Sequence, residues 1–254
     1  MDSVLVAYSG GVDSTFLLKV AKDVLDGKVL AVTASSSTYP DEELEFAKKM
    51  AKILGVRHRI IKTQELENKR FISNPINRCY FCKKELFGRL KDIAQKFKLN
   101  FVVDATNVSD IKDYRPGNIA KKEFNIRSPL QEAGFTKEDI RKLSKRLGLV
   151  TWDKPSLACL ASRIPYGTKI SLKMLERIQK AEKFLRQIGF KEARLRHYNG
   201  LCRIEVPKSD ILSLISKRDK VVNRLKRIGY NYITVDLEGY RTGSMNELLR
   251  KTKI

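Results

Sequence analysis

The sequence predicts an α/β protein with a parallel sheet of five-stranded type, flanked by helices and followed by a small C-terminal α+β domain. A short apolar segment, residues 3–8, ends in two glycines and leads at once into a helical pattern. Strand-like and helical segments then alternate at short spacing, which is typical of parallel strands joined by right-handed crossovers. From residue 171 the pattern changes, and Asn199-Gly200 between two alternating segments indicates a β-hairpin. We therefore expect domains of residues 1–165 and 166–254.

The individual elements follow from periodicity and from residues that begin or end helices. Pro40 lies near the start of one helix and Gly55 directly after its end. A later helix begins with a capping box, in which Asp139 follows Thr136 by three residues. The first domain is expected to contain helices over residues 14–25, 40–54, 85–97 and 136–147, strands over 28–33, 57–61 and 100–103, and an extended segment over 125–130. The second is expected to contain helices over 172–188 and 209–228 and strands over 193–198, 201–206 and 232–237.

The turn after the first strand has the sequence Ser9-Gly-Gly-Val-Asp-Ser14. Two glycines allow a ligand to approach the backbone closely. The N–H groups at the start of the following helix, with the two serine hydroxyls, then form a cradle for an anion. Neither G-x-x-x-x-G-K-[ST] nor G-x-G-x-x-G, the two common phosphate loops, is present here. A plain glycine turn between strand and helix is the alternative interpretation.

This hexapeptide resembles the PP-loop of the N-type ATP pyrophosphatases, enzymes that split ATP into AMP and pyrophosphate. The resemblance implies an adenine nucleotide alpha hydrolase-like domain that binds ATP with Mg²⁺, and Asp13 is expected to be catalytic. Ligands of a parallel sheet bind at the C-terminal ends of its strands, so polar residues at the end of the second strand are expected beside ATP as well. The residues expected to bind ATP are Ser9, Gly10, Gly11, Asp13, Ser14, Thr33 and Ser35.

The charge of the chain is strongly basic and unevenly distributed. There are 51 lysines and arginines against 29 acidic residues, a net charge of +22. Residues 1–159 carry 29 basic and 20 acidic side chains, and residues 160–254 carry 22 and 9. This excess suits tRNA or another polyanion, but a solvated, charge-rich surface explains it equally well. No apolar run approaches the roughly 18 residues of a membrane helix, and the chain starts directly with a strand, so we expect a cytoplasmic protein with no membrane partner.

The four cysteines fall into three settings. Cys79 and Cys82 form a Cys-x-x-Cys pair, Cys159 stands alone, and Cys202 shares a strand face with Ile204, which favours a buried core thiol. In a cytosolic chain the pair suggests a metal site or redox chemistry. Three thiols are one ligand short of a closed zinc site, but they suit a [4Fe–4S] cluster with one iron open to sulfide. A redox dithiol or plain structural thiols remain open on spacing alone.

Five blocks of sequence carry a more specific signal. They are residues Ser9–Ser14, Asp113–Gly117, Arg127–Leu130, Lys154–Gly167 and Gly239–Asn246. Together they resemble the LarE family of ATP-dependent sulfur transferases, along nearly the whole chain. The resemblance implies a PP-loop domain followed by a small C-terminal domain. It also implies thiolation of the carboxylates of pyridinium-3,5-biscarboxylic acid mononucleotide, on the way to the nickel-pincer nucleotide cofactor of lactate racemase.

The resemblance also bears on the source of sulfur. Some family members use one cysteine, at the position of Cys159, which gives up its own sulfur and becomes dehydroalanine. Others carry Cys-x-x-Cys as well and are similar to tRNA thiolases in which three cysteines hold a [4Fe–4S] cluster. This chain has Cys79, Cys82 and Cys159 and so resembles the second kind. We expect these three to hold a cluster, with Cys159 also catalytic and with sulfide or another sulfur donor as a partner.

Two arginines of the second domain are candidates for binding the substrate. Arg194 and Arg196 alternate on one face of a predicted strand, a spacing that suits the phosphate of a mononucleotide, and the family uses arginines in this strand for that purpose. A solvated basic edge is the alternative. We expect the second domain to serve substrate binding or oligomerisation, and the protein to form a homo-oligomer. Thiolation of a tRNA base and a non-catalytic ATP sensor remain competing functions, although no pattern of a separate RNA-binding module is visible.

Overall fold

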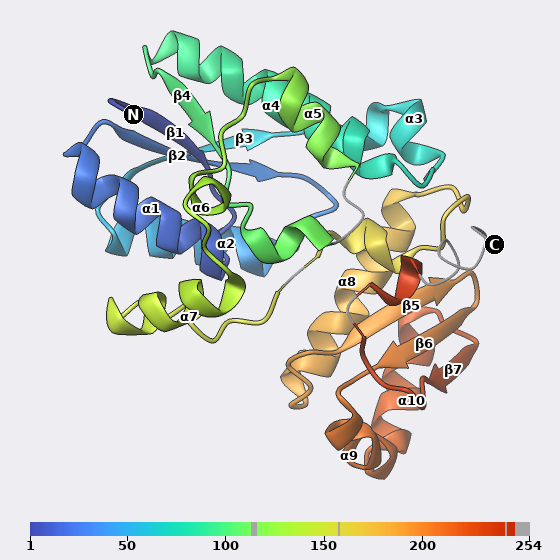
Figure 1. Cartoon of the computed structure of the whole chain (residues 1–254). Coiled ribbons are helices and arrows are strands. Elements are labelled where there is room, and N and C mark those ends of the chain that lie inside the picture. Colours follow the sequence, from blue (N-terminus) through green and yellow to red (C-terminus); the bar gives the residue numbers. More distant parts are fainter. Residues whose placement is uncertain (113–115, 157, 242, 247–254) are drawn as a thin grey trace. The chain divides into compact units, whose positions relative to one another are not determined.

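The chain forms two compact units in a computed structural model that describes residues 1–112, 116–156, 158–241 and 243–246 (Figure 1). The first unit comprises Met1–Phe71 and Pro75–Leu157, and the second Ile72–Asn74 and Ala158–Ile254. The sequence had placed the boundary near residue 165. The segment Ile72–Asn74 belongs to the second unit. The side-chain amide of Asn74 donates hydrogen bonds to the carbonyl oxygens of Pro165 and Thr168, at 2.7 and 3.0 Å.

A parallel sheet forms the centre of the first unit, which confirms the predicted α/β class. Its strands are β1 (Val4–Ala7), β2 (Val29–Ser35), β3 (Arg57–Lys62) and β4 (Phe101–Val103), in the order β3-β2-β1-β4. Within the described residues the sheet therefore has four strands, one fewer than predicted. The extended segment over 125–130 contributes a single parallel bridge between Val103 and Arg127, because helix α6 (Pro129–Glu132) begins two residues further on.

Helices connect and cover these strands. They are α1 (Val12–Leu25), α2 (Asp41–Ile53), α3 (Lys69–Ile72), α4 (Arg78–Lys96), α5 (Gly117–Glu123), α6 and α7 (Lys137–Arg146), with short 3-10 turns η1 (Glu65–Glu67) and η2 (Val108–Lys112). Because the strands are parallel, the loops that lead into α1, α2 and α4 leave the sheet at one edge, where its strands end. The loop of Ser9–Ser14 lies at this edge.

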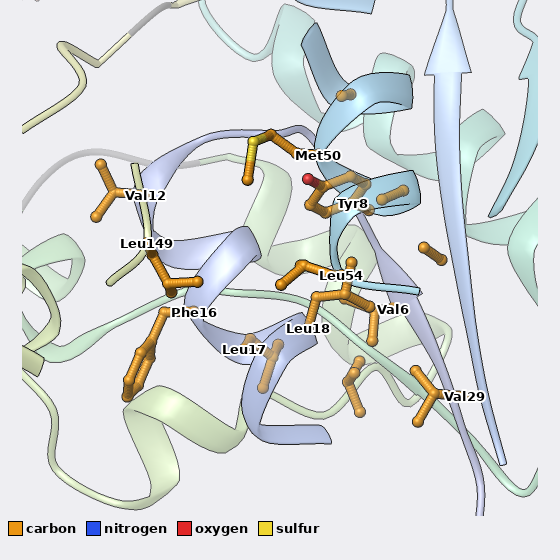
Figure 2. Close-up of a cluster of buried hydrophobic side chains, with 14 of the residues drawn as sticks. Val6, Tyr8, Val12, Phe16, Leu17, Leu18, Val29, Met50, Leu54 and Leu149 are labelled. Atoms are coloured by element: carbon orange, nitrogen blue, oxygen red, sulfur yellow. The ribbon is translucent and has the colours of Figure 1, made fainter. Parts of the chain in front are cut away.

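The alternation of side chains along β1 places apolar residues on both faces of the sheet. Val4 and Val6 join a buried cluster with residues of α1 and α2, whereas Leu5 joins a second cluster that includes Phe87 and Leu90 of α4. Figure 2 shows the first cluster, in which the apolar side of α1 packs beneath the loop. The sheet is therefore covered on both faces, as parallel sheets generally are, and the loop follows directly after its buried first strand.

The helix that carries the Cys-x-x-Cys pair begins earlier than the sequence predicted. We expected a helix over 85–97, but α4 starts at Arg78, so Cys79 and Cys82 lie in its first turns. Further along, α4 buries Phe87, Leu90 and Ala94 at helical spacing, whereas its start buries the charged Arg78. A search for apolar periodicity therefore misses the first turns.

The second unit contains an antiparallel hairpin, β5 (Arg194–Tyr198) and β6 (Leu201–Glu205), with β7 (Tyr232–Val235) parallel to β6. Asn199 has a φ of +55°, as the predicted turn requires, and Tyr198 pairs with Leu201 across it. The helix predicted over 209–228 is divided in two at Lys217. The helical elements are η3 (Leu160–Arg163), α8 (Leu172–Gln187), η4 (Lys208–Asp210), α9 (Ile211–Ser216), α10 (Arg218–Ile228) and η5 (Ser244–Asn246).

Among the described residues, no helix combines the length and apolar character needed to cross a membrane. Cys202 is fully buried in β6, as predicted, and burial raises the pKa of its thiol to about 12. That thiol is therefore a core residue.

Candidate active site

The loop between β1 and α1 has a backbone that only glycine adopts easily. Gly10 has a φ of +68°, and a Cβ at this position would lie 3.0 Å from the Cα of Ala47 in α2. The hydroxyls of Ser9 and Ser14 lie 3.0 Å apart, and the Ser14 hydroxyl also donates to the carbonyl oxygen of Gly11. Helix α1 begins with no described side chain capping it, so its first N–H groups point toward the loop as an anion site does.

Asp13 combines a strong ion pair with an unpaired oxygen. Its Oδ2 lies 2.6 Å from Nζ of Lys137, the first residue of α7. Its Oδ1 is buried and has no hydrogen-bond partner among the described residues. A buried carboxylate oxygen in this state is costly unless something else binds it. The side chain is therefore suited to a divalent cation or to a donor that arrives with a ligand.

A second lysine approaches the loop from the segment after α7. Nζ of Lys154 lies 2.8 Å from Oε2 of Glu43 and 3.2 Å from the carbonyl oxygen of Gly10, and it sits 3.6 Å from the centroid of the Phe46 ring. The Tyr39 hydroxyl donates a hydrogen bond to the carbonyl oxygen of Ser9. These contacts hold the Lys154 ammonium and the Tyr39 phenol against the loop, although the two residues lie far apart in the sequence.

These groups enclose a small pocket of about 140 Å³ at the loop. Its lining is polar and carries both lysines, which gives a site where negative charge is stabilised. The pocket is lined by Ser9, Gly11, Val12, Asp13, Tyr39, Glu43, Lys137, Lys154, Pro155 and Ser156.

Thr33 and Ser35 lie at the C-terminal end of β2, where the sequence predicts them. The Thr33 side chain is buried, and its hydroxyl donates to the carbonyl oxygen of Tyr8 at 2.8 Å and contacts Nε2 of His58 at 2.8 Å. Ser35 is half-buried at the end of β2. Neither is among the described residues that line the loop pocket. Thr33 instead supports the backbone that leads into the loop.

All four cysteines belong to the described part of the chain and are thiols rather than disulfides. Cys79 is exposed and Cys82 is half-buried, and their spacing of three places them on one face of α4. The Cys82 thiol donates to Oε1 of the buried Glu65, at 3.7 Å. Cys159 belongs to the second unit, directly before η3. Within the described residues, no three His, Cys, Asp or Glu side chains are grouped as a metal site.

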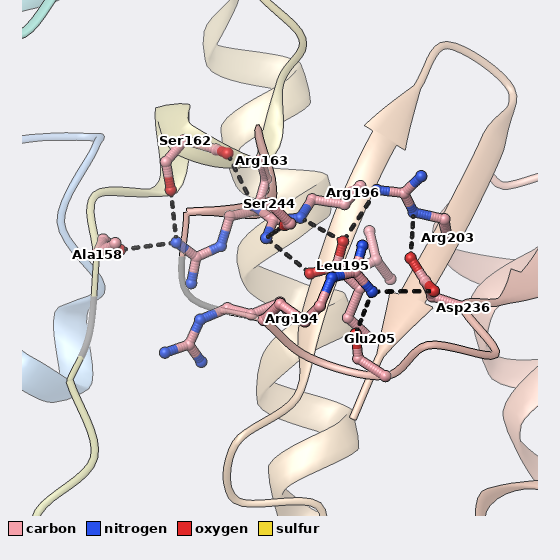
Figure 3. A network of polar contacts seen from close by, with 12 residues as sticks. Ala158, Ser162, Arg163, Arg194, Leu195, Arg196, Arg203, Glu205, Asp236 and Ser244 are labelled. Carbon is pink, nitrogen blue, oxygen red and sulfur yellow. Dashed lines mark hydrogen bonds and ion pairs between the residues drawn. The ribbon is translucent and has the colours of Figure 1, made fainter. Parts of the chain in front are cut away.

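The arginines of β5 are buried, which rules out the solvated basic edge considered for them. Arg194 is 3% exposed and Arg196 is 5% exposed. Arg196 makes a two-pronged ion pair with Glu205, at 2.9 and 2.7 Å, and also donates to the Ser162 carbonyl oxygen (Figure 3). The Arg194 guanidinium lies 5.1 Å from the centroid of the Tyr240 ring.

A second buried ion pair lies beside this strand. Arg163, the last residue of η3, donates hydrogen bonds to both oxygens of Glu182 in α8, at 2.8 and 3.1 Å. Burial alone would raise the pKa of Glu182, but the charge and hydrogen bonds of Arg163 outweigh it and hold the pKa below its ordinary value. Burial and the charge of Arg163 together lower the pKa of Arg194. The interior of the second unit is therefore rich in positive charge.

Known proteins of similar sequence identify the family. A family model described as queuosine biosynthesis protein QueC matches residues 3–75. A protein of Lactiplantibacillus plantarum named pyridinium-3,5-bisthiocarboxylic acid mononucleotide synthase is 39% identical over 255 residues, covering 100% of this chain and 92% of that protein. The chain belongs to the LarE family. An uncharacterized protein of Synechocystis is 43% identical, over 99% of this chain and 94% of its own length. One of Methanocaldococcus jannaschii is 31% identical, over 94% and 91%.

In this LarE family member, sequence reasoning found the loop but missed the residues that face it. Lys137 and Lys154 were not predicted as site residues, although each lies in a segment that the sequence analysis singled out for another reason. Lys137 is the first residue of a helix whose capping box was recognised, and Lys154 opens one of the five sequence blocks. Of the block Asp113–Gly117, residues 113–115 lie outside the described residues, as do Leu157 in the fourth block and Thr242 in the last.

Proposed function

We propose that the protein is an ATP-dependent sulfurtransferase that converts a carboxylate of pyridinium-3,5-biscarboxylic acid mononucleotide into a thiocarboxylate. The observation that carries this proposal is the loop pocket, where Lys137 pairs with Asp13 and Lys154 with Glu43, and where Oδ1 of Asp13 is buried without a described hydrogen-bond partner. Such a pocket suits a polyphosphate chain and its cation. The relationship over the whole chain to a synthase of the bisthiocarboxylic acid mononucleotide supports the choice of acceptor.

The loop performs the ATP half of the reaction in this account. A carboxylate is a poor acyl donor, so its oxygen first attacks the α-phosphorus of ATP, and pyrophosphate leaves. The N–H groups at the start of α1, the serine hydroxyls and the two lysines stabilise the negative charge that develops on the leaving group. Lys137 is held by Asp13 and Lys154 by Glu43 before ATP arrives, so both ammonium groups are already oriented.

Mg²⁺ fits this site by the chemistry of its donors. The unpaired Oδ1 of Asp13 is the hard oxygen ligand that Mg²⁺ prefers, and nucleotide phosphates and water supply the others in comparable sites. When bound, the ion neutralises charge on the departing pyrophosphate. Asp13 would then be shared between the ion and Lys137.

Sulfur delivery is assigned to Cys79, Cys82 and Cys159. Cys79 and Cys82 suit the binding of one shared metal centre, because they lie on one face of α4 with one thiol exposed and one half-buried. A [4Fe–4S] cluster held by three thiolates would offer its remaining iron to sulfide. Sulfide then attacks the acyl carbon of the adenylate, the bond to AMP breaks, and AMP leaves with the bridging oxygen. The sacrificial alternative uses the sulfur of Cys159 itself.

Arg194 and Arg196 are assigned to the phosphate of the mononucleotide. The buried charged residues described in the second unit are three arginines and two glutamates, namely Arg163, Arg194, Arg196, Glu182 and Glu205. Two guanidinium groups on neighbouring positions of one strand face are the donors that grip a phosphate best, which supports the assignment.

The proposed ATP chemistry is tested by Gly11→Val with pyrophosphate release as the readout. Gly11 has a φ of −80°, which valine tolerates, and the new Cβ would lie 3.4 Å from Oγ of Ser9, inside the cradle. We expect a folded protein, checked by circular dichroism, that releases no pyrophosphate in the presence of the acceptor. Undiminished release by this variant would show that the loop is not the ATP site.

A further inference from the structure

A second and larger pocket lies in the first unit, on the outer side of α4. It has a volume of about 760 Å³, against about 140 Å³ for the pocket at the glycine loop, and the two share no lining residue among those described. It is lined by Asn68, Lys69, Arg70, Tyr80, Phe81, Lys84, Glu85, Gly88, Arg89, Asp92 and Phe124. The proposed sulfur transfer uses none of these side chains.

The lining combines positive charge with aromatic rings. Four cationic and two acidic residues line the pocket, an excess of two positive charges. The Arg70 guanidinium lies 6.0 Å from the centroid of Phe81, and Nζ of Lys84 lies 5.5 Å from the centroid of Tyr80. Rings and cations held side by side are the groups that bind a nucleotide, since the rings stack with the base and the cations neutralise its phosphate.

Gly88 provides an independent observation. It lies in the middle of α4, where glycine is less favourable than any residue except proline. The packing does not demand glycine, because an added Cβ would lie 3.6 Å from the Phe124 ring, an ordinary contact distance. The missing side chain instead keeps the floor of the pocket open. A glycine that weakens a helix and serves no packing need is best explained by the space it leaves.

We propose that this pocket binds a nucleotide, as a second site distinct from the glycine loop. The rings accept the base, and Lys69, Arg70 and Lys84 accept the phosphate. Tyr80 and Phe81 are the two residues between Cys79 and Cys82, so the bound nucleotide lies next to the Cys-x-x-Cys pair in sequence and on the same helix. The nucleotide is either a free mononucleotide or an unpaired nucleotide of an RNA, since both present the same base and phosphate.

Binding of two probes to the full chain tests the proposal, with the glycine loop saturated by a non-hydrolysable ATP analogue and Mg²⁺. Uridine monophosphate is measured by equilibrium dialysis and a short single-stranded oligouridylate by fluorescence anisotropy. We expect at least one probe to bind. Lys84→Glu should weaken binding by about tenfold or more, as loss of a charge-assisted contact does. Lys96→Glu, the same charge change at an exposed position on α4 outside the pocket, should change it little.

Gly88→Leu fills the floor of the pocket and should abolish binding without changing pyrophosphate release at the loop. Binding of uridine monophosphate would identify a small-molecule site, and binding of the oligonucleotide alone would identify an RNA site; either supports the proposal. The proposal is overturned if neither probe binds the natural protein, or if Lys84→Glu and Gly88→Leu bind as well as it does.

Discussion

At the scale of single residues, the pair of Asp13 and Lys137 carries much of the proposed ATP site. Lys137→Ala removes one of two ammonium groups at the pocket and leaves both oxygens of Asp13 without a described partner. We expect ATP binding in the presence of Mg²⁺ to weaken by roughly tenfold, as for loss of a hydrogen bond to a charged group. Calorimetric titration measures this. Lys142→Ala, on the same helix but paired with Glu138 at the exposed surface, is the control and should bind normally.

The buried pair of Arg163 and Glu182 gives a prediction about stability. Arg163→Met leaves the carboxylate of Glu182 buried at 1% exposure with its principal partner gone, a change that costs about 3–5 kcal/mol in comparable cases. The midpoint of urea unfolding of the second unit should fall accordingly. The control is Arg127→Met, which removes a similar two-pronged ion pair with Glu132 at the exposed surface. The urea midpoint of this variant should stay close to that of the natural protein.

The same glutamate predicts a pH dependence. Because the pKa of Glu182 is lowered in the folded state, its contribution to stability is complete above the ordinary value of 4.5 and is lost as the pH falls through the lowered folded-state pKa. The free energy of unfolding of the natural protein should therefore decline over this acidic range. Glu182→Gln should be less stable at neutral pH but should lack this part of the decline. If the free energy of unfolding declined with acid in parallel for the two proteins, the lowered pKa of Glu182 would be contradicted.

At the scale of elements, the contact between the glycine loop and α2 sets the position of the loop. Gly10→Ala meets two costs, the positive φ and a Cβ 3.0 Å from Ala47. Gly148→Ala meets only the first, since its φ is +66° and nothing lies within 4 Å of the added Cβ. We expect both variants to lose stability in thermal unfolding, and Gly10→Ala to lose more. Equal losses would mean that α2 moves aside without cost.

The elements also show where sequence reasoning stops. The strands and helices around the loop were predictable because apolar residues recur at the spacing of a strand or a helix. The start of α4 was not, because its buried residue is the charged Arg78. Lys137 and Lys154 could not be placed at the loop from their own neighbourhoods, since their partners Asp13 and Glu43 lie more than one hundred residues away in sequence. Long-range ion pairs of this kind leave no local pattern.

At the scale of the whole molecule, the cysteines decide whether the protein turns over or acts once. If Cys79, Cys82 and Cys159 hold a cluster, added sulfide should support many products per chain, and Ser substitution of any one should lower iron content while adenylation continues. Anaerobic iron and sulfide analysis with product counting measures this. Loss of the elements of hydrogen sulfide from Cys159, with at most one product per chain, would instead establish the sacrificial route. Cys202→Ser is the control for cysteine replacement. This variant should keep the iron content of the natural protein, because the Cys202 thiol is buried in the core.

The central claim, that ATP activates a carboxylate of the acceptor for replacement by sulfur, is tested most directly by following the oxygen of that carboxylate. The pyridinium mononucleotide is prepared with oxygen-18 in its carboxylates and incubated with ATP, Mg²⁺ and sulfide under anaerobic conditions. Because the bridging oxygen of the adenylate leaves with AMP, mass spectrometry should find one oxygen-18 atom in the AMP for each thiocarboxylate formed. Thiocarboxylate formed with unlabelled AMP, or with ADP and phosphate in its place, would contradict the account.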